Sequence, residues 1–259
     1  KGVFSANNPT HPRFEWLYPD MFLDEGKAGR HLVLRRGGKI VSSVGTYPLT
    51  LNTAGCKVTI AGVGQVATSQ EMAGRGCMSQ LLEASIARME EEGVALSWLS
   101  GRHDRYGRFG WEFVFRGYNH SFIEKIGRTA DDSFHVTQEK CTDAVMTDEL
   151  FAMRGSNSYI SDTMANYSVV MQRSEAELWV ARPRGSSEPV AWTIVFPGAK
   201  KLAEYCGTVD GILHLVKVAA VRFGGASVFA SPADKDLNER LRAESSGMYL
   251  NIGTGSQIL

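Results

Sequence analysis

The chain has 259 residues, which corresponds to between one and two domains of roughly 150 residues each. Its 28 Lys and Arg balance 28 Asp and Glu, so it lacks the basic surface of a nucleic-acid-binding protein. Hydrophobic residues make up 43% and charged residues 22%, which excludes a disordered chain, and no apolar run approaches the roughly 18–20 residues that span a membrane.

The first half is predicted to alternate helices with antiparallel strands. Gly37-Gly38 is a typical two-residue hairpin turn. Pro48 lacks the N–H that a strand interior needs, so we expect it to end the second strand. The predicted elements are a helix over Arg13–Leu23, strands over His31–Arg36, Ile40–Tyr47 and Val58–Thr68, a helix after Gly76, a strand over Val94–Ser100, a short helix over Tyr106–Trp111 and a strand over Glu112–Phe122.

The second half repeats this order at a spacing of about 130 residues, which indicates duplication of one fold. We therefore expect two α+β domains, 1–130 and 131–259, each with a mixed, mostly antiparallel sheet flanked by helices. The first copy lacks the opening strand of the second, and that strand is expected upstream of Lys1 or is absent. The predicted elements of the second copy are strands over Phe134–Glu139, Leu178–Ala181, Val190–Phe196, Leu202–Cys206, Ser227–Ala230 and Met248–Ile252, and helices over Asp143–Met153, Ile212–Phe223 and Asp236–Arg242.

The cysteines and histidines form no metal-binding pattern. Cys56, Cys77, Cys141 and Cys206 include no CxxC pair, and the six histidines include no ligand cluster. The sequence therefore predicts no metal and no disulfide framework, as is typical of a protein in the reducing cytoplasm.

A glycine-containing loop is the most informative stretch. Val66-Ala67-Thr68, at the end of a strand, is followed by Ala73-Gly74-Arg75-Gly76-Cys77-Met78 and an amphipathic helix. Such a turn points several backbone N–H groups and the positive end of the helix dipole in one direction, which suits a diphosphate. Within the strand, Gly62 and Gly64 indicate a bulge or the close approach of another molecule.

The same loop has a simpler interpretation, a strand-to-helix connector that binds nothing. A P-loop is excluded because no Lys-Ser/Thr follows Gly76. A dinucleotide-binding fold is excluded because the preceding strand lies among hairpins and does not open a parallel βαβ unit.

Val63 to Thr68, Arg75-Gly76 and Leu81-Leu82, followed by Tyr106-Gly107-Arg108-Phe109-Gly110-Trp111, resemble the GNAT superfamily of N-acetyltransferases, and most closely its tandem-domain, Eis-like branch. The resemblance covers nearly all of residues 13–122 in element order. It implies acetyl-CoA as co-substrate, with its pyrophosphate on the loop amides and its pantetheine arm paired with the preceding strand. The cofactor-binding residues it implies are Val66, Ala67, Thr68, Ala73, Gly74, Arg75, Gly76, Cys77 and Met78.

Two of these residues depart from the family pattern Q/R-x-x-G-x-G/A. Ala73 replaces the first Gln or Arg, and Met78 replaces the last small residue. Ala73 removes a side chain but no backbone amide, so weaker CoA binding is expected without loss of the cradle.

Tyr106 is the candidate general acid. Acyl transfer from a thioester releases a CoA thiolate, and a phenol with a pKa near 10 can protonate it. The motif places Tyr106 in this role, whereas Phe109 and Trp111 are expected to pack the short helix onto the sheet.

The general base is open among several groups. Nearby candidates are His103, Asp104 and Glu71, and His103 is preferred. Some Eis-like proteins place a histidine ahead of the tyrosine, where this chain reads Trp98-Leu99-Ser100. The resemblance also offers the terminal carboxylate as the base, which Leu259 supplies only if it is the natural C-terminus.

The second copy is expected to be degenerate. Its matching loop, Glu204 to Gly211, has no Arg-Gly-x-Gly element, and Asp210 would repel a pyrophosphate. The second copy would then form one side of the acceptor site. The Eis-like pattern usually continues into a third, sterol-carrier-like domain that this sequence does not include, so acceptor specificity and the oligomeric state stay open, a homo-oligomer among the alternatives.

The resemblance implies an N-acetyltransferase in which a primary amine of a small molecule or a lysine attacks acetyl-CoA directly in a ternary complex. No nucleic-acid and no membrane partner are expected. The alternatives are a non-catalytic acyl-CoA-binding or scaffold protein and a tandem-domain aminoacyl transferase, for which the neutral composition offers no tRNA-binding surface.

Overall fold

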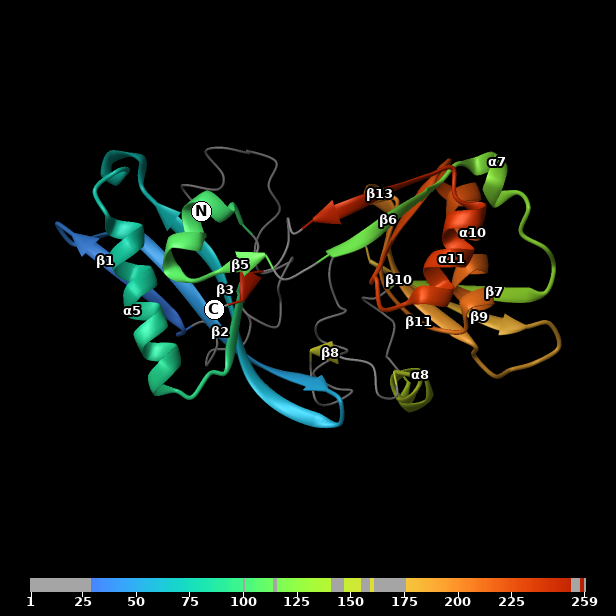
Figure 1. Ribbon diagram of the computed structural model, residues 1–259, viewed down its shortest axis with the longest axis horizontal. Coiled ribbons are helices and arrows are strands. Elements are labelled where there is room, and N and C mark those ends of the chain that lie inside the picture. Colours follow the sequence, from blue (N-terminus) through green and yellow to red (C-terminus); the bar gives the residue numbers. More distant parts are fainter. Residues whose placement is uncertain are drawn as a thin grey trace. The chain divides into compact units, whose positions relative to one another are not determined.

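The computed structural model describes residues 29–99, 101–113, 116–140, 147–154, 159–160, 176–252 and 257–258. These residues form two compact units, each built on its own seven-stranded mixed sheet (Figure 1). The first unit holds the described residues up to Phe113 together with 159–160 and 257–258, and the second holds those from Arg116 to Ile252 apart from 159–160. The α+β class with a mixed sheet in each half is confirmed.

The sheet of the first unit has the strand order β1-β2-β3-β4-β14-β5, with β8 paired to β2. Its neighbours are antiparallel except β3 and β4, which run parallel because the helix α5 connects them as a crossover. The elements are β1 (His31–Arg36), β2 (Lys39–Thr53), β3 (Cys56–Thr68), η1 (Gln70–Met72), α5 (Cys77–Glu91), β4 (Leu96–Leu99), α6 (His103–Tyr106), η2 (Gly107–Phe109), β5 (Glu112–Phe113), β8 (Tyr159–Ile160) and β14 (Gln257–Ile258).

The hairpin of β1 and β2 turns at Gly37 and Gly38, whose φ angles of 55° and 78° suit glycine. The expectation that Pro48 ends the return strand is wrong, because β2 continues and Pro48 pairs with Ala61. The strand β1 stops opposite Gly45, so one edge of β2 has no partner from β1 at Pro48. A residue without an N–H is tolerated at such an edge.

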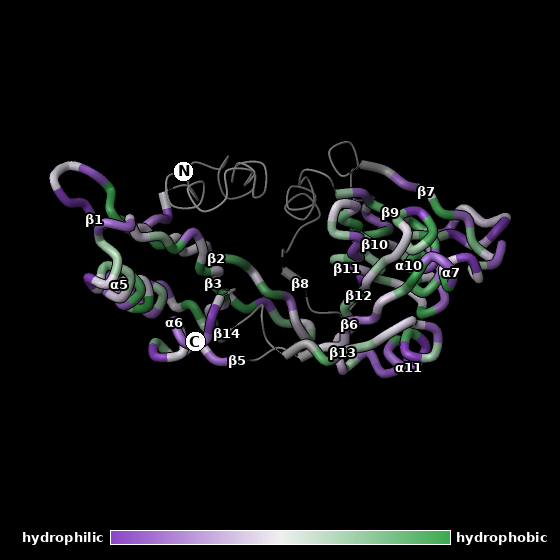
Figure 2. Tube along the Cα trace, turned by 90° about the horizontal axis from the view of Figure 1, so that it is seen from above, coloured by the Kyte–Doolittle hydropathy of each residue, from purple (hydrophilic) through white to green (hydrophobic). Residues whose placement is uncertain are grey.

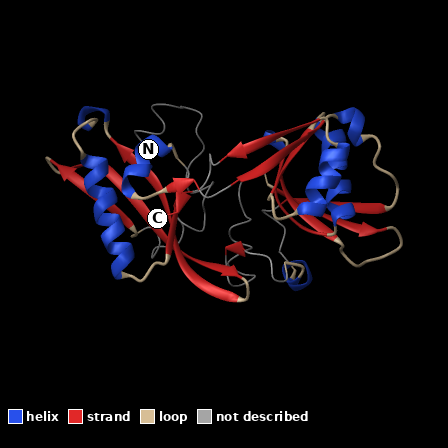
Figure 3. Ribbon diagram, in the orientation of Figure 1, coloured by secondary structure: helices blue, strands red, loops and turns tan. Residues whose placement is uncertain are grey.

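The helix α5 covers one face of this sheet (Figure 3). Hydrophobic residues recur along it at helical spacing and alternate with hydrophilic ones (Figure 2). Leu81, Leu82 and Met89 are buried in one cluster with Val44 and Val63 of the sheet. The segment that follows β3 is therefore held rigidly by the core below it.

The sheet of the second unit has the order β13-β6-β12-β11-β10-β9-β7, and only β11 and β12 in it run parallel. Thr208 begins the helix between them, and Gly224 ends it. The elements are β6 (Arg116–Phe122), α7 (Glu124–Gly127), β7 (Phe134–Lys140), α8 (Asp148–Ala152), β9 (Glu177–Pro183), β10 (Ala191–Phe196), η3 (Pro197–Ala199), β11 (Lys201–Gly207), α10 (Val209–Phe223), β12 (Ala226–Ala230), α11 (Lys235–Glu244) and β13 (Gly247–Ile252).

Both faces of this second sheet are covered. Trp179 packs in one cluster with residues of α10 and α11, whereas its neighbours Leu178 and Val180 pack in another with Leu150 of α8. Successive strand residues point to opposite faces, so α10 and α11 share one face and α8 covers the other.

The predicted strand Glu112–Phe122 is divided between the units. Its start, β5, pairs in the first sheet, while β6 lies between β12 and β13 of the second, where Phe122 is buried in the core. In the same way β14, which follows β13, pairs between β4 and β5 of the first sheet. The units therefore divide between Phe113 and Arg116, and not at the expected residue 130.

Two predicted helices extend beyond the described residues. Arg13–Leu23 lies wholly outside them, and of Asp143–Met153 the helix Asp148–Ala152 is seen. Among the helices that the structure describes, none is long and apolar enough to cross a membrane.

Candidate functional site

A free strand edge opens where β3 and β4 separate. The two strands pair from Ile60 with Leu96 to Val63 with Leu99, and β3 then continues to Thr68. Its other edge stays paired with β2, and Ser42 Oγ donates to the Ala67 carbonyl at 3.0 Å. In the described part of the sheet, the β4-facing edge after Val63 has no strand partner, so its main-chain groups can pair with an extended ligand.

A bulge lies where this edge begins. The register of β2 and β3 shifts between Gly45 and Ser43, and Gln65 of β3 adopts a φ of 48°, which is rare for a residue other than glycine. Two hydroxyls hold it: the Tyr47 hydroxyl donates to Gln65 Oε1 at 2.5 Å, and Ser43 Oγ donates to the Gln65 carbonyl at 3.2 Å. The bulge expected from the strand glycines is therefore present, and hydrogen bonds from β2 stabilise the conformation of Gln65 in it.

Tyr47 is itself fixed by its neighbours. It is 1% exposed, its hydroxyl lies 3.0 Å from His31 Nε2, and burial raises the pKa of the phenol well above its ordinary value. A Cβ atom on Gly45 would come within 2.4 Å of the same hydroxyl. Gly45 is therefore needed for Tyr47 to reach the bulge.

The loop after β3 leads into an open helix N-terminus. Gly74 and Gly76 have φ angles of 73° and 75°, and a Cβ on either would meet nothing within 4 Å. Gly76 supplies no capping side chain to α5, and within the described residues the amides of Cys77, Met78 and Ser79 have no acceptor. These amides and the helix dipole form the anion cradle that the sequence predicts. Its side chains differ in exposure: Ala73 and Arg75 are exposed, Met78 is half-buried and Cys77 is buried.

The turn that carries Tyr106 packs against the end of β4. The Tyr106 side chain is 9% exposed, belongs to the core cluster with Leu99, and meets Trp111 edge-on at 6.3 Å between ring centroids. Burial raises the pKa of its phenol. A Cβ on Gly101 would come within 2.4 Å of the Tyr106 ring, so the absence of a side chain there lets the ring lie where it does.

Arg108 joins this turn to the cradle. Its guanidinium donates to the hydroxyl of Ser79 in the first turn of α5, and it lies 4.6 Å from the centroid of the Phe109 ring. The element that carries Tyr106 and the helix that carries the free amides are thus connected directly.

His103 is oriented toward Glu112. Its Nε2 lies 3.1 Å from Glu112 Oε2, its ring stacks on Phe113 at 4.8 Å, and it lies over Gly107, where a Cβ would be 2.7 Å from the ring. Its side chain is 39% exposed. The geometry thus gives His103 a carboxylate partner, as a histidine base often has.

The other two candidate bases are less suited. Arg102 donates to both carboxylate oxygens of Asp104, at 2.9 and 2.6 Å, and this hydrogen bonding lowers the pKa of Asp104. Glu71 is exposed on η1. Ser100 and Leu259 lie outside the described residues.

The second unit has closed the corresponding cradle. The Thr208 hydroxyl caps α10 by accepting from the Gly211 amide at 3.2 Å, and the Thr208 amide donates to the Val190 carbonyl at 2.8 Å. A Cβ on Gly207 would lie 2.2 Å from that carbonyl, so the chain here is tightly packed. An uncapped, open helix start is found in α5 and not in α10.

The sequence of residues 3–114 matches the family described as acetyltransferase (GNAT) domain. This part of the chain is therefore similar to a GNAT acetyltransferase domain. The resemblance to the GNAT superfamily, stated from the cradle and the tyrosine motif, is thereby confirmed. No curated protein matches the sequence.

Several solved structures share the fold of this chain at low sequence identity. A GCN5-related N-acetyltransferase from Kribbella flavida is 16% identical over 89% of this chain, with a TM-score of 0.66. A probable N-acyltransferase of unknown function from Enterococcus faecalis is 15% identical over 99%, with a TM-score of 0.75. Eis1 from Mycobacterium abscessus is 11% identical over 88%, with a TM-score of 0.61. The chain spans 59%, 67% and 63% of these proteins, respectively.

Two contacts of the site could not be predicted from sequence motifs. Tyr47 and Gln65 meet only because a bulge shifts the register of two strands. Arg108 lies in the tyrosine motif, but its contact with Ser79 spans 29 positions. Gly62 and Gly64, which directly precede the bulge, were the available signal, and they predicted its place without its partners.

Proposed function

We propose that the chain is an acetyl-CoA-dependent N-acetyltransferase whose first unit holds the catalytic site. One observation carries the proposal: a free strand edge runs into an uncapped helix N-terminus, and Arg108 links that helix to the turn bearing a buried tyrosine. The strand edge would pair with the pantetheine arm, and the amides of Cys77, Met78 and Ser79 would take the pyrophosphate. The whole protein's acceptor is proposed to be a primary amine of a small molecule or a lysine.

The backbone near the bulge would polarise the thioester. The amides of Val66 and Ala67 follow Gln65, whose conformation is held by Tyr47 and Ser43. A donor fixed in advance at the carbonyl oxygen stabilises the negative charge that develops there during attack.

The reaction is a direct transfer. The amine nitrogen attacks the carbonyl carbon of acetyl-CoA, the carbon–sulfur bond breaks, and the electron pair leaves on sulfur. Tyr106 gives its proton to this thiolate, because burial keeps the phenol protonated at neutral pH and equally raises the basicity of a thiolate that forms in the same environment. The attacking ammonium must first lose one proton, and His103, oriented by Glu112, is the proposed acceptor. The nitrogen loses a second proton as the amide forms, and this proton restores the Tyr106 phenol through solvent.

The test measures thiol release from acetyl-CoA with a panel of amines. Tyr106→Phe is expected to lower kcat by about 10²-fold or more, as is usual for loss of a general acid, and to leave CoA binding by calorimetry within a factor of about two. Tyr205→Phe in the second unit is the matched control and should keep full activity. Equal rates for wild type and Tyr106→Phe would remove the tyrosine from the mechanism.

The same titration separates the alternatives. Binding of CoA without turnover of any amine would favour a non-catalytic acyl-CoA-binding protein. Absence of CoA binding would overturn both that function and the enzyme, and would leave the connector interpretation of the glycine loop.

A further inference from the structure

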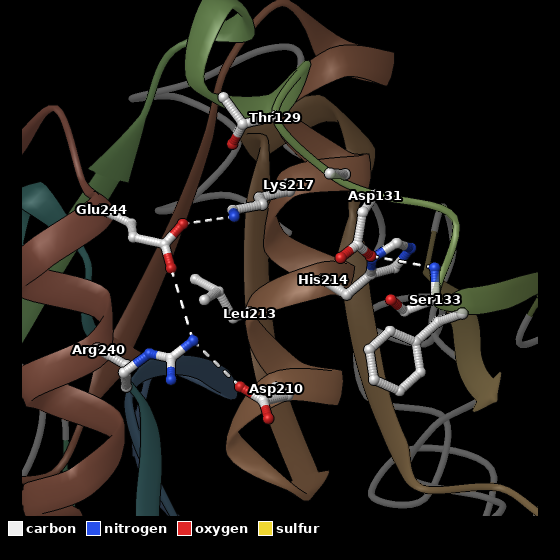
Figure 4. Close-up of a pocket in the computed structure, with 11 residues that line it drawn as sticks. Thr129, Asp131, Ser133, Asp210, Leu213, His214, Lys217, Arg240 and Glu244 are labelled. Carbon is white, nitrogen blue, oxygen red and sulfur yellow. Dashed lines mark hydrogen bonds and ion pairs between the residues drawn. The ribbon is translucent and has the colours of Figure 1, made fainter.

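A polar groove runs along α10 in the second unit. None of its lining residues belongs to the proposed acetyl-CoA site. Its volume is about 330 Å³, in the range of small-molecule sites. Leu213 and His214 of α10 form its floor (Figure 4). The segment 129–134 forms one wall, and Arg240 and Glu244 of α11 form the other.

The charges along the α11 wall satisfy one another. Arg240 contacts Asp210 at 3.1 Å and Glu244 at 3.8 Å, and Glu244 also pairs with Lys217 (Figure 4). Two cations and two carboxylates thus form one chain of ion pairs. Both Arg240 and Lys217 are therefore already paired with carboxylates, and neither offers an unpaired positive charge to an anion.

His214 is different, because it is 7% exposed and lines the groove without a hydrogen bond to the described residues. Its ring contacts that of Phe134, at 5.1 Å between centroids. Burial lowers the pKa of the imidazole, which keeps it neutral at pH 7 with one ring nitrogen able to accept. A buried polar group of this kind normally has a partner, and here the open space beside it belongs to the groove.

Asp131 supplies the opposite side. Its carboxylate accepts from the Ser133 amide at 3.0 Å, and this hydrogen bond lowers its pKa. No cation of the described residues lies within ion-pair distance of it. The lining therefore has one carboxylate more than it has cations, next to an acceptor nitrogen.

We propose that this groove binds a small organic ammonium compound, whose N–H groups donate to His214 and Asp131 and whose carbon chain lies against Phe134 and Leu213. A cation is favoured because the lining has one carboxylate more than it has cations, with the exposed Asp131 at its edge. A donor suits the site because Asp131 can only accept and the neutral imidazole of His214 has one accepting ring nitrogen besides the one that donates. The aromatic ring adds a favourable face for an alkylammonium ion.

The inference is independent of the proposed function, since none of its residues belongs to the CoA cradle or the Tyr106 turn. It gives the second unit a ligand site of its own, along the side of α10 from Asp210 in its first turn to Lys217.

The experiment follows the His214 imidazole by NMR in the full chain, with the resonance assigned through His214→Gln. The probe is n-butylammonium, and n-butanol is its uncharged counterpart. Butylammonium should shift the His214 resonance in a saturable way, and butanol should not. Asp131→Asn should weaken binding by about tenfold, because a charge-assisted hydrogen bond is lost.

Asp132→Asn is the matched control, because Asp132 is adjacent, exposed and paired with Arg184 outside the groove. Its affinity for the probe should equal that of wild type. An unchanged affinity in Asp131→Asn, an equal response to butanol, or a His214 shift caused by inorganic phosphate and not by butylammonium would overturn the proposal. Tyr106→Phe should keep the titration while losing thiol release, so failure of this site and failure of the proposed function are separate results.

Discussion

Arg108 donates a hydrogen bond to Ser79, and through it the turn that ends in Tyr106 is attached to the first turn of α5. Ser79 carries one of the amides that have no acceptor among the described residues. A pyrophosphate that settles on those amides would therefore contact the same turn that fixes Arg108. We infer that cofactor binding and the placement of Tyr106 depend on one contact.

Removal of this contact should affect both steps. Ser79→Ala and Arg108→Ala are each expected to lower kcat/KM for acetyl-CoA by roughly threefold to tenfold, as loss of an exposed charge-assisted hydrogen bond does. Because the two residues act as a unit, the double variant should be no worse than the worse single variant. Steady-state kinetics at varied acetyl-CoA measures this, and additive losses would show that the contact carries no coupling. Arg128→Ala, at an exposed arginine of the second unit, is the control.

Gly101 should be needed for the position of the Tyr106 ring. A Cβ there would lie 2.4 Å from ring atom Cε2, so Gly101→Ala must move the ring. We expect lower kcat with a nearly unchanged KM for acetyl-CoA, because the displaced group acts on the leaving sulfur and not on the phosphates. In a Tyr106→Phe background the added methyl should cost no further activity. A further drop in that background would mean that Gly101→Ala acts elsewhere.

The Tyr47 hydroxyl should stabilise the bulge in β3. Tyr47→Phe leaves His31 Nε2 and Gln65 Oε1 without this partner in a buried place, which costs about 1–3 kcal/mol of unfolding free energy. Urea denaturation measures the loss. If the bulge amides polarise the thioester, the folded variant should also be less active than wild type. The activity is therefore assayed at urea concentrations well below the unfolding midpoint, where the variant is folded. Full activity there would separate the bulge from catalysis.

Local patterns predicted most elements of both units, because the alternation of strands and the helical spacing of α5 and α10 depend only on residues that are close in sequence. The exchange of β6 and β14 between the sheets was missed, since strand pairing is non-local and residues 112–122 read as one strand. The anion cradle was predicted because Gly74 and Gly76 lie in sequence beside the helix that they open. The Tyr47–Gln65 and Arg108–Ser79 contacts could not be predicted, because each forms only when the fold brings residues together that are distant in sequence.

The ion pair of Glu92 with Arg30 should make stability depend on pH. Arg30 Nη1 and Arg88 Nε each donate to Glu92 Oε1 at 2.9 Å. The hydrogen bond from Arg30 is the main cause that lowers the pKa of Glu92 from 4.5 to about 2. A carboxyl group whose pKa is lower in the folded state stabilises the fold above its unfolded pKa. That contribution is lost as the pH falls from about 4.5 through about 2.

Glu92→Gln should therefore be less stable than wild type at pH 7, and the difference should shrink toward zero between pH 4.5 and 2. Urea denaturation across this range measures it, and added salt should reduce the difference at pH 7, because the pair is partly exposed. Glu91→Gln is the matched control, since Glu91 is exposed and makes no ion pair within the described residues. A stability difference for Glu92→Gln that stayed constant from pH 7 to pH 2 would show that the substitution acts through packing and not through the charge. Its disappearance with salt alone, at constant pH, would by contrast assign the whole effect to the ion pairs of Glu92 with Arg30 and Arg88.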